Sequence, residues 1–351
     1  MASCFSHIGA KTIPTVDLSP FTTTASDSER LEAGQTLVNA LHGLGFVKVV
    51  GHGVTKDEIQ DGLAWTKKLF DLPYEEKMKA PHPPGPMPHR GYSGIGLEKV
   101  YSPADVDAQG TEVDISRGLR KISDFKESYE IGSEDDPVQQ NIWLPDEVLP
   151  RFRICMTAFY QRLAGVSEML LKVISIGLGL NDEEHALFTK LISDRHCQLR
   201  LLHYPAVSRD KLQTDLIARL PSHTDWGTFT LLFQDERGGL ELKDPQSQDY
   251  LHAEPEEGAF VLNIGDMLQR FTNDYFISAP HRVSVPSLDT VSESGIPARY
   301  SIPFFICPGF SHTVETLPRF VTAEKPVKYE PVRFDEYGSL VSKYQYQGGE
   351  S

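Results

Sequence analysis

The sequence of 351 residues lacks several features that mark specialised classes of protein. It contains no run of about 18 apolar residues, so no membrane-spanning helix is expected. Its N-terminal segment has no basic stretch followed by an apolar one, so no secretory signal is expected. The cysteines are far apart and form no CxxC pair, which predicts reduced thiols instead of disulfides or a zinc site: Cys4, Cys155, Cys197 and Cys307. We therefore expect a cytoplasmic protein.

Positive charge is also scarce. The chain has 34 Lys and Arg against 49 Asp and Glu, a formal net charge of −15. A general nucleic-acid binder needs a basic face for phosphates, so this class is not expected. The hydrophobic fraction of 40% and the charged fraction of 24% are ordinary for a folded globular protein. We expect a small-molecule partner and neither nucleic acid nor membrane, while the sequence leaves the oligomeric state open.

The first half of the chain carries helical patterns and two short strand-like runs. Strands are predicted at 13–19 and 45–54, and amphipathic helices at 27–44, 57–73 and about 147–179. The segment 81–96 is rich in Pro and Gly, which predicts a loop without regular structure.

After residue 197, short β-like runs recur between turn signals, without helices between them. The runs are QLRLLHYP, TFTLLFQD, GLELKD, AFVLNIGDML, HRVSVP and RYSIPFFICP. This rhythm is typical of an antiparallel double sheet such as a jelly roll. We expect an α+β fold with a mainly β core, in which an N-terminal helical and β region (1–195) braces a C-terminal core with its tail (196–351).

The tripeptide His223-Thr224-Asp225 is the main chemical signal. In an extended segment, residues i and i+2 face the same way, so His223 and Asp225 can reach one ion. His281, at the start of a later β-like run, is the candidate third ligand. Two imidazoles and one carboxylate leave coordination positions open, as in oxygen-activating Fe(II) sites, whereas zinc favours a closed tetrahedron or a hydrolytic site. By itself, an HxD tripeptide is more often a surface His beside a turn Asp.

A second pattern lies in the run RYSIPFF, where Arg299 and Ser301 share a face. A guanidinium inside an apolar barrel is costly unless it meets an anion, and a small dicarboxylic acid would satisfy it. A protein carboxylate at the barrel rim would serve equally well. Tyr204, in LLHYP, is either a further hydroxyl on the same anion or a core tyrosine.

These motifs resemble a known family. The runs HTDWGTFTLLFQD, GAFVLNIGDMLQRFTNDYFISAPHRV and RYSIPFF are similar to the isopenicillin N synthase-like group of 2-oxoglutarate/Fe(II)-dependent dioxygenases, and the resemblance covers roughly residues 13–310. It implies a double-stranded β-helix core with Fe(II) on His223, Asp225 and His281, and no catalytic side chain beyond these ligands. It also implies O2 and 2-oxoglutarate as co-substrates, the distal carboxylate of 2-oxoglutarate being held by Arg299 and Ser301, and ascorbate as an additive in vitro.

The same resemblance matches Tyr204 to the Tyr of the family's NxYP-type motif. Leu202 stands where many members carry Asn, so that the contact of this Asn is not expected here. The implied function is oxidation of a small organic substrate, a specialised metabolite, by hydroxylation, desaturation or oxidative rearrangement. The alternatives are a co-substrate-free Fe(II) oxidase of the isopenicillin N synthase type, a catalytically inactive jelly-roll binding protein, and a zinc-dependent hydrolase.

Five residues are candidates for contact with the substrate. His89, Arg90 and Tyr92 lie in the Pro- and Gly-rich loop, which could act as a lid, although they could equally be solvated loop residues. Phe304 and Phe305 lie near the mouth of the barrel. Because they alternate between faces, one of them is expected to pack in the core.

Overall fold

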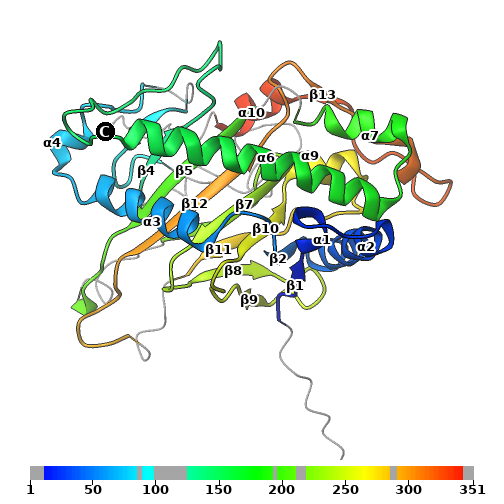
Figure 1. Ribbon diagram of the computed structural model, residues 1–351, viewed down its shortest axis with the longest axis horizontal. Coiled ribbons are helices and arrows are strands. Elements are labelled where there is room, and N and C mark those ends of the chain that lie inside the picture. The colour runs from blue at the N-terminus through cyan, green and yellow to red at the C-terminus, as the bar shows by residue number, and fades with distance from the viewer. Residues whose placement is uncertain are drawn as a thin grey trace, which may run out of the picture.

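Two β-sheets form the centre of the computed structural model, which describes residues 12–84, 89–98, 125–192, 196–210, 219–284 and 291–342 (Figure 1). The larger sheet has the order β1 (Thr15–Asp17), β2 (Phe46–Val50), β10 (Phe260–Ile264), β7 (Phe229–Gln234), β12 (Arg299–Ile306), β5 (Cys197–Tyr204), β4 (Glu127–Ile131) and β3 (Gly91–Ser93). The smaller sheet has the order β6 (Leu220–His223), β11 (His281–Val283), β8 (Leu240–Lys243) and β9 (Tyr250–His252). A short pair, β13 (Thr313–Val314) and β14 (Val332–Arg333), lies near the C-terminal end.

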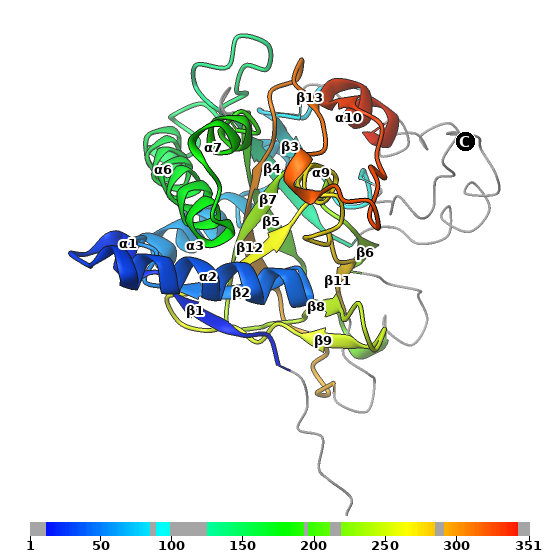
Figure 2. The same ribbon diagram turned by 90° about the vertical axis from the view of Figure 1, so that its right-hand side faces the viewer.

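Helices cover the face of the larger sheet that is turned away from the smaller one (Figure 2). These are α1 (Ser19–Thr22), α2 (Asp27–Leu44), α3 (Lys56–Phe70), α6 (Phe152–Leu178) and α7 (Asp182–Thr189). Helix α2 packs on α6, and α3 packs on β12 and β5. Among the described residues, short helices also lie elsewhere: α4 (Tyr74–Lys77), α9 (Asp266–Phe271), the 3-10 helix η3 (Pro318–Phe320) and α10 (Phe334–Ser342). In the described part of the chain, no helix combines the length and apolar character that a membrane crossing requires.

Local sequence explains where the two long N-terminal helices begin. Ser26 and Glu29 form a capping box at the start of α2, and Thr55 and Glu58 form the same motif at the start of α3. Helix α2 ends at Gly45, whose φ of 71° lies in the left-handed region. A Cβ at this position would also lie 2.2 Å from a backbone carbonyl oxygen, so glycine is required there.

The strands of the larger sheet alternate between a core face and a cavity face. On β5, Leu199 and Leu201 are fully buried in the core that the sheet shares with the helices. The intervening side chains line a cavity between the two sheets: Gln198, Arg200, Leu202 and Tyr204. This period of two places every functional side chain of β5 on one face.

The predicted fold class is confirmed, with a double-sheet core braced by the N-terminal helices. Three local predictions were wrong. The third helix begins at Phe152 and not near 147, because Pro150 restricts the preceding residue and Arg151 has a positive φ of 68°. The run AFVLNIGDML divides at Gly265 into β10 and α9. The Pro- and Gly-rich loop contains β3, which pairs with β4; its residues 85–88 lie outside the described ranges.

Candidate metal and co-substrate site

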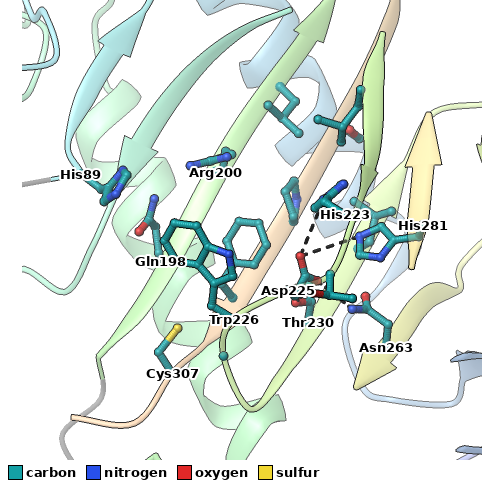
Figure 3. A pocket seen from close by; sticks show the side chains of 18 of the residues that line it. His89, Gln198, Arg200, His223, Asp225, Trp226, Thr230, Asn263, His281 and Cys307 are labelled. Carbon is teal, nitrogen blue, oxygen red and sulfur yellow. Dashed lines mark hydrogen bonds and ion pairs between the residues drawn. The ribbon is translucent and has the colours of Figure 1, made fainter. Parts of the chain in front are cut away.

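Three predicted metal ligands meet at the edge of the smaller sheet. Strand pairing places His281 opposite His223, and Asp225 follows two residues after the end of β6. Asp225 Oδ1 lies 3.9 Å from His223 Nε2 and 3.7 Å from His281 Nε2. One ligand atom from each residue lies within 4.8 Å of the others. Figure 3 shows the carboxylate turned toward both imidazole rings.

The hydrogen bonds of the two histidines determine which nitrogen faces the cluster. His223 Nδ1 lies 2.9 Å from the carbonyl oxygen of Pro221, and His281 Nδ1 lies 3.2 Å from that of Ala279. A carbonyl oxygen only accepts, so both Nδ1 atoms donate, and the neutral ring keeps its lone pair on Nε2. Burial, helped by the neighbouring His281, lowers the pKa of His223 to about 3. This imidazole is therefore neutral at physiological pH, as a metal ligand must be.

The carboxylate of Asp225 is oriented by two neutral donors. Thr230 Oγ1 and Asn263 Nδ2 each donate to Oδ2 over 2.7 Å. Burial alone would raise the pKa of Asp225, but the imidazoles of His281 and His223 and these two hydrogen bonds lower it below its usual value. Oδ2 is thus occupied by protein donors, while Oδ1 faces the two Nε2 atoms.

These donors fit a divalent first-row metal ion. Such an ion lies about 2.1 Å from nitrogen and oxygen ligands, so two ligand atoms that share it stand at most about 4.2 Å apart. Both Asp–His separations, 3.9 and 3.7 Å, are below that limit. Two imidazoles and one carboxylate are the donor set of oxygen-activating Fe(II).

The predicted anion site lies on β12 and β5. Arg299 is 1% exposed, and its guanidinium donates to Gly238 O (2.6 Å), Ser301 Oγ (2.9 Å) and Gln234 Oε1 (3.0 Å). All three acceptors are neutral. Among the described residues, no carboxylate lies within ion-pair distance of Arg299, so none of them neutralises this buried charge directly.

Two further side chains border this guanidinium. Tyr204 lies opposite Arg299 in the strand register, and its ring centroid is 5.1 Å from Arg299 Cζ. The sequence did not single out Arg219, which is 3% exposed and whose Cζ lies 6.0 Å from the same ring. Burial and the neighbouring Arg299 lower the pKa of Arg219 to about 10. Two buried guanidinium groups therefore border the ring of Tyr204.

The metal cluster and the anion site open into one cavity of about 210 Å³ between the sheets. Both sheets contribute to its lining, as does the C-terminal helix α10 through Phe334, Asp335, Gly338 and Ser339. Tyr337 of this helix donates a hydrogen bond to Asp266 over 2.7 Å, which fixes α10 to the start of α9. The sequence did not indicate that α10 borders the cavity.

The structure divides the five candidate substrate residues. His89 and Phe305 line the cavity. Arg90, Tyr92 and Phe304 are not among its lining residues, so the geometry does not support their predicted contact with the substrate.

Each of these three side chains has another role. Arg90 is buried and donates to backbone oxygens of Gln139 and His89 and to Asp136. Tyr92 donates to Glu127 over 2.5 Å. Phe304 is fully buried in the core beside Tyr160.

Several residues that line the cavity were not predicted from the sequence. Trp226 follows Asp225 directly, and Arg200 and Gln198 share the cavity face of β5 with Tyr204. The two-residue alternation of QLRLLHY could have indicated Arg200, because a charged residue there shares a face with Tyr204. No local pattern indicates Lys126, which reaches the cavity from just before β4.

Known proteins resemble this chain over most of its length. Two family models match the chain. One, "non-haem dioxygenase in morphine synthesis N-terminal", matches residues 13–150, and the other, "2OG-Fe(II) oxygenase superfamily", matches residues 195–308. The proline hydroxylase buaE of Petromyces alliaceus is 41% identical over 297 residues, 84% of this chain and 87% of that protein. The 2-oxoglutarate-dependent dioxygenase imqE of Aspergillus flavus is 35% identical over 350 residues, 96% and 95% of the two chains.

A solved structure shares the fold. Full-length Neurospora crassa T7H in complex with alpha-KG and thymine has a TM-score of 0.81 and 32% identity, and the match covers 95% of this chain and 97% of that chain. The chain therefore belongs to the 2OG-Fe(II) oxygenase superfamily. It is a dioxygenase that uses Fe(II), O2 and 2-oxoglutarate. These matches favour this class over the co-substrate-free oxidase, the inactive binding protein and the zinc hydrolase.

Proposed function

We propose that His223, Asp225 and His281 hold the catalytic Fe(II). The observation that carries this assignment is the meeting of two Nε2 atoms and one carboxylate oxygen in a buried site. When bound, Fe(II) and 2-oxoglutarate supply oxidative chemistry, in which O2 is reduced, 2-oxoglutarate becomes succinate and CO2, and a substrate C–H bond is oxidised. The protein orients the ligands through the backbone carbonyls and through Thr230 and Asn263.

We assign the distal carboxylate of 2-oxoglutarate to Arg299 and Ser301. The three neutral acceptors of Arg299 fix its plane and leave its charge for a ligand. Ser301 Oγ already accepts from Arg299, so its own hydrogen can be donated to the same carboxylate. Tyr204 is the additional contact in this proposal, because its ring borders Arg299 and lines the cavity.

The substrate in this proposal is a small organic molecule, and the first candidate reaction is hydroxylation. Support comes from the cavity of about 210 Å³ and from two relatives: buaE is named a proline hydroxylase, and T7H was solved with thymine. His89 and Phe305 remain candidate substrate contacts because both line the cavity. Desaturation, oxidative rearrangement and a role in specialised metabolism stay predictions from the sequence.

Succinate release tests this function. Purified protein is supplied with Fe(II), 2-oxoglutarate and a panel of small metabolites, and succinate is measured with and without O2. We expect substrate-stimulated succinate that requires both Fe(II) and O2, with one oxidised product formed for each succinate. Oxidised product without succinate would favour the co-substrate-free oxidase.

Two further expectations extend this proposal. We propose that regions 1–195 and 196–351 fold as one unit, because strands from both regions pair in the larger sheet. A single unfolding transition by circular dichroism would test it. The cytoplasmic location stays a prediction, which microscopy of the tagged protein would test.

A further inference from the structure

A second group of buried charges lies on the cavity side of the larger sheet, apart from Arg299. We call Lys126 and Arg200 the cationic wall, since both line the cavity. Lys126 Nζ lies 2.7 Å from Glu98 Oε2, and Arg200 Nη1 lies 3.5 Å from the same oxygen. Arg200 Nε also pairs with Glu130. The side chains of Lys126, Glu98 and Glu130 are at most 2% exposed, so these are interior charges.

The strand register relates the cationic wall to the anion site. Tyr204 lies opposite Arg299, and Arg200 is four residues earlier on the same strand and the same face. Four residues of a strand span roughly 13 Å. The sheet therefore presents two separate cationic positions to one cavity. Figure 3 shows Arg200 and Gln198 across the cavity from His281.

The charges of the cationic wall are arranged asymmetrically. Lys126 and Arg200 line the cavity, whereas Glu98 and Glu130 are not among its lining residues. Gln198 also lines the cavity, and its Nε2 bonds to Glu130. Both cations thus belong to residues that line the cavity, whereas the carboxyl groups that offset the cost of their burial belong to residues that do not.

The surroundings shift the pKa values of the two carboxyl groups in opposite directions. Burial by itself would raise the pKa of Glu98, but Lys126 and Arg200 hold this pKa well below its usual range. Burial raises the pKa of Glu130 despite the opposing effect of Arg200. Lys126 and Arg200 nevertheless both line the cavity. A carboxylate suits this pair of residues, because it can accept hydrogen bonds from an ammonium and a guanidinium group.

We propose that Lys126 and Arg200 bind a carboxylate of the substrate, so that the enzyme oxidises a small carboxylic acid. This inference rests on the proposed function, in which iron and 2-oxoglutarate occupy the other end of the cavity. A carboxylate held at the cationic wall directs the rest of the molecule toward His223 and His281, across the cavity. Charge-assisted hydrogen bonds from Arg200 would fix its orientation.

The test compares acids with their own amides. Full-length protein is loaded with Fe(II) and 2-oxoglutarate without O2, and binding of small carboxylic acids, L-proline among them, and of their primary amides is measured by calorimetry. We expect at least one acid to bind, and its amide to bind at least about tenfold more weakly. Succinate release in O2 should follow the same preference.

Substitutions in the cationic wall test whether its residues cause the preference for the acid. Lys126→Met and Arg200→Gln should weaken binding of the acid at least about tenfold and leave the amide unchanged. The matched control is Lys77→Met, which removes another buried lysine, paired with Glu127 over 2.7 Å, that does not line the cavity. It should leave the ratio between acid and amide unchanged.

Each outcome decides the inference. Equal binding of acid and amide, a preference for amides, or a panel in which no acid binds would overturn it. A preference for the acid that persists in both cavity variants would do the same. If these variants do not fold, the ratio of the affinities for the acid and for its amide, measured on the unaltered protein, tests the inference. If 2-oxoglutarate itself fails to bind to the iron-loaded protein, the proposed function has failed and not only this inference.

Discussion

The two cationic positions of the cavity hold their charge in different ways. Arg299 donates only to neutral groups, whereas Arg200 shares the carboxyl groups of Glu98 and Glu130 with Lys126. A buried guanidinium without an anion costs folding free energy that a ligand can recover. For a guanidinium that is paired with carboxylates, the cost of burial is already offset, and removing the guanidinium leaves those carboxylates buried without a counter-charge. We therefore predict that replacing Arg299 mainly weakens ligand binding, whereas replacing Arg200 also lowers the free energy of unfolding.

The largest effect is expected at the metal. Asp225→Ala removes the only carboxylate of the triad, so the two imidazoles alone should not retain iron. Iron content after anaerobic purification should fall from stoichiometric to background, and succinate release should fall with it. Asp249→Ala, at an exposed turn, serves as the control. Stoichiometric iron in Asp225→Ala would remove this residue from the ligand set.

The next effect is expected at the anion site. Arg299→Gln removes a charge-assisted contact worth about 2–5 kcal/mol, so the Kd of 2-oxoglutarate should rise roughly 30-fold or more. The free energy of unfolding of the ligand-free protein should stay equal or increase, because an unbalanced buried charge is removed. Calorimetry and urea unfolding measure the two quantities. A large loss of stability without a change in Kd would reverse the comparison.

The opposite result is expected at Arg200. Arg200→Gln leaves the carboxyl groups of Glu98 and Glu130 buried with less compensation. The free energy of unfolding should fall by about 3–5 kcal/mol, while the Kd of 2-oxoglutarate stays within a factor of about three. Urea unfolding without ligands measures the loss. Arg200→Lys, which keeps the charge, should recover part of it.

A smaller effect is expected at the donors that orient the metal ligand. Asn263→Ala removes one of the two hydrogen bonds to Asp225 Oδ2. Loss of such an orienting contact weakens metal binding about 10- to 100-fold. Competition with a chelator measures the iron affinity. An unchanged affinity would mean that Thr230 alone fixes the carboxylate.

The smallest effect concerns pH. Burial, and then the nearby Arg200, lowers the pKa of His89 to about 3, whereas an unfolded chain titrates near 6.5. Between these values the unfolded state binds a proton that the folded state does not, so stability falls as pH falls. From pH 7 to pH 5, His89 should account for up to about 2 kcal/mol of lost stability. His89→Gln should show a shallower pH dependence in urea unfolding; an identical one would contradict this.

Sequence patterns predicted one end of the cavity and not the other. His223 and Asp225 lie in one short motif and Arg299 and Ser301 in another, and the two-residue spacing in each puts the side chains on one face. The structure brings both motifs and the distant His281 to one cavity. Lys126 and Arg200 of the cationic wall and their partner Glu98 are far apart in the chain and meet only in the folded structure. Tertiary contacts likewise put Arg90, Tyr92 and Phe304 outside the cavity, because backbone oxygens, Glu127 and the core provide their partners.

The central claim is that one cavity holds iron on His223, Asp225 and His281 and 2-oxoglutarate on Arg299. The most direct measurement is anaerobic titration of Fe(II)-loaded protein with 2-oxoglutarate, followed by visible absorption. We predict a charge-transfer band that saturates at one equivalent of 2-oxoglutarate, is absent from Asp225→Ala and requires a much higher concentration in Arg299→Gln. Protein that retains Fe(II) but develops no band, or an undiminished band in Asp225→Ala, would contradict the claim.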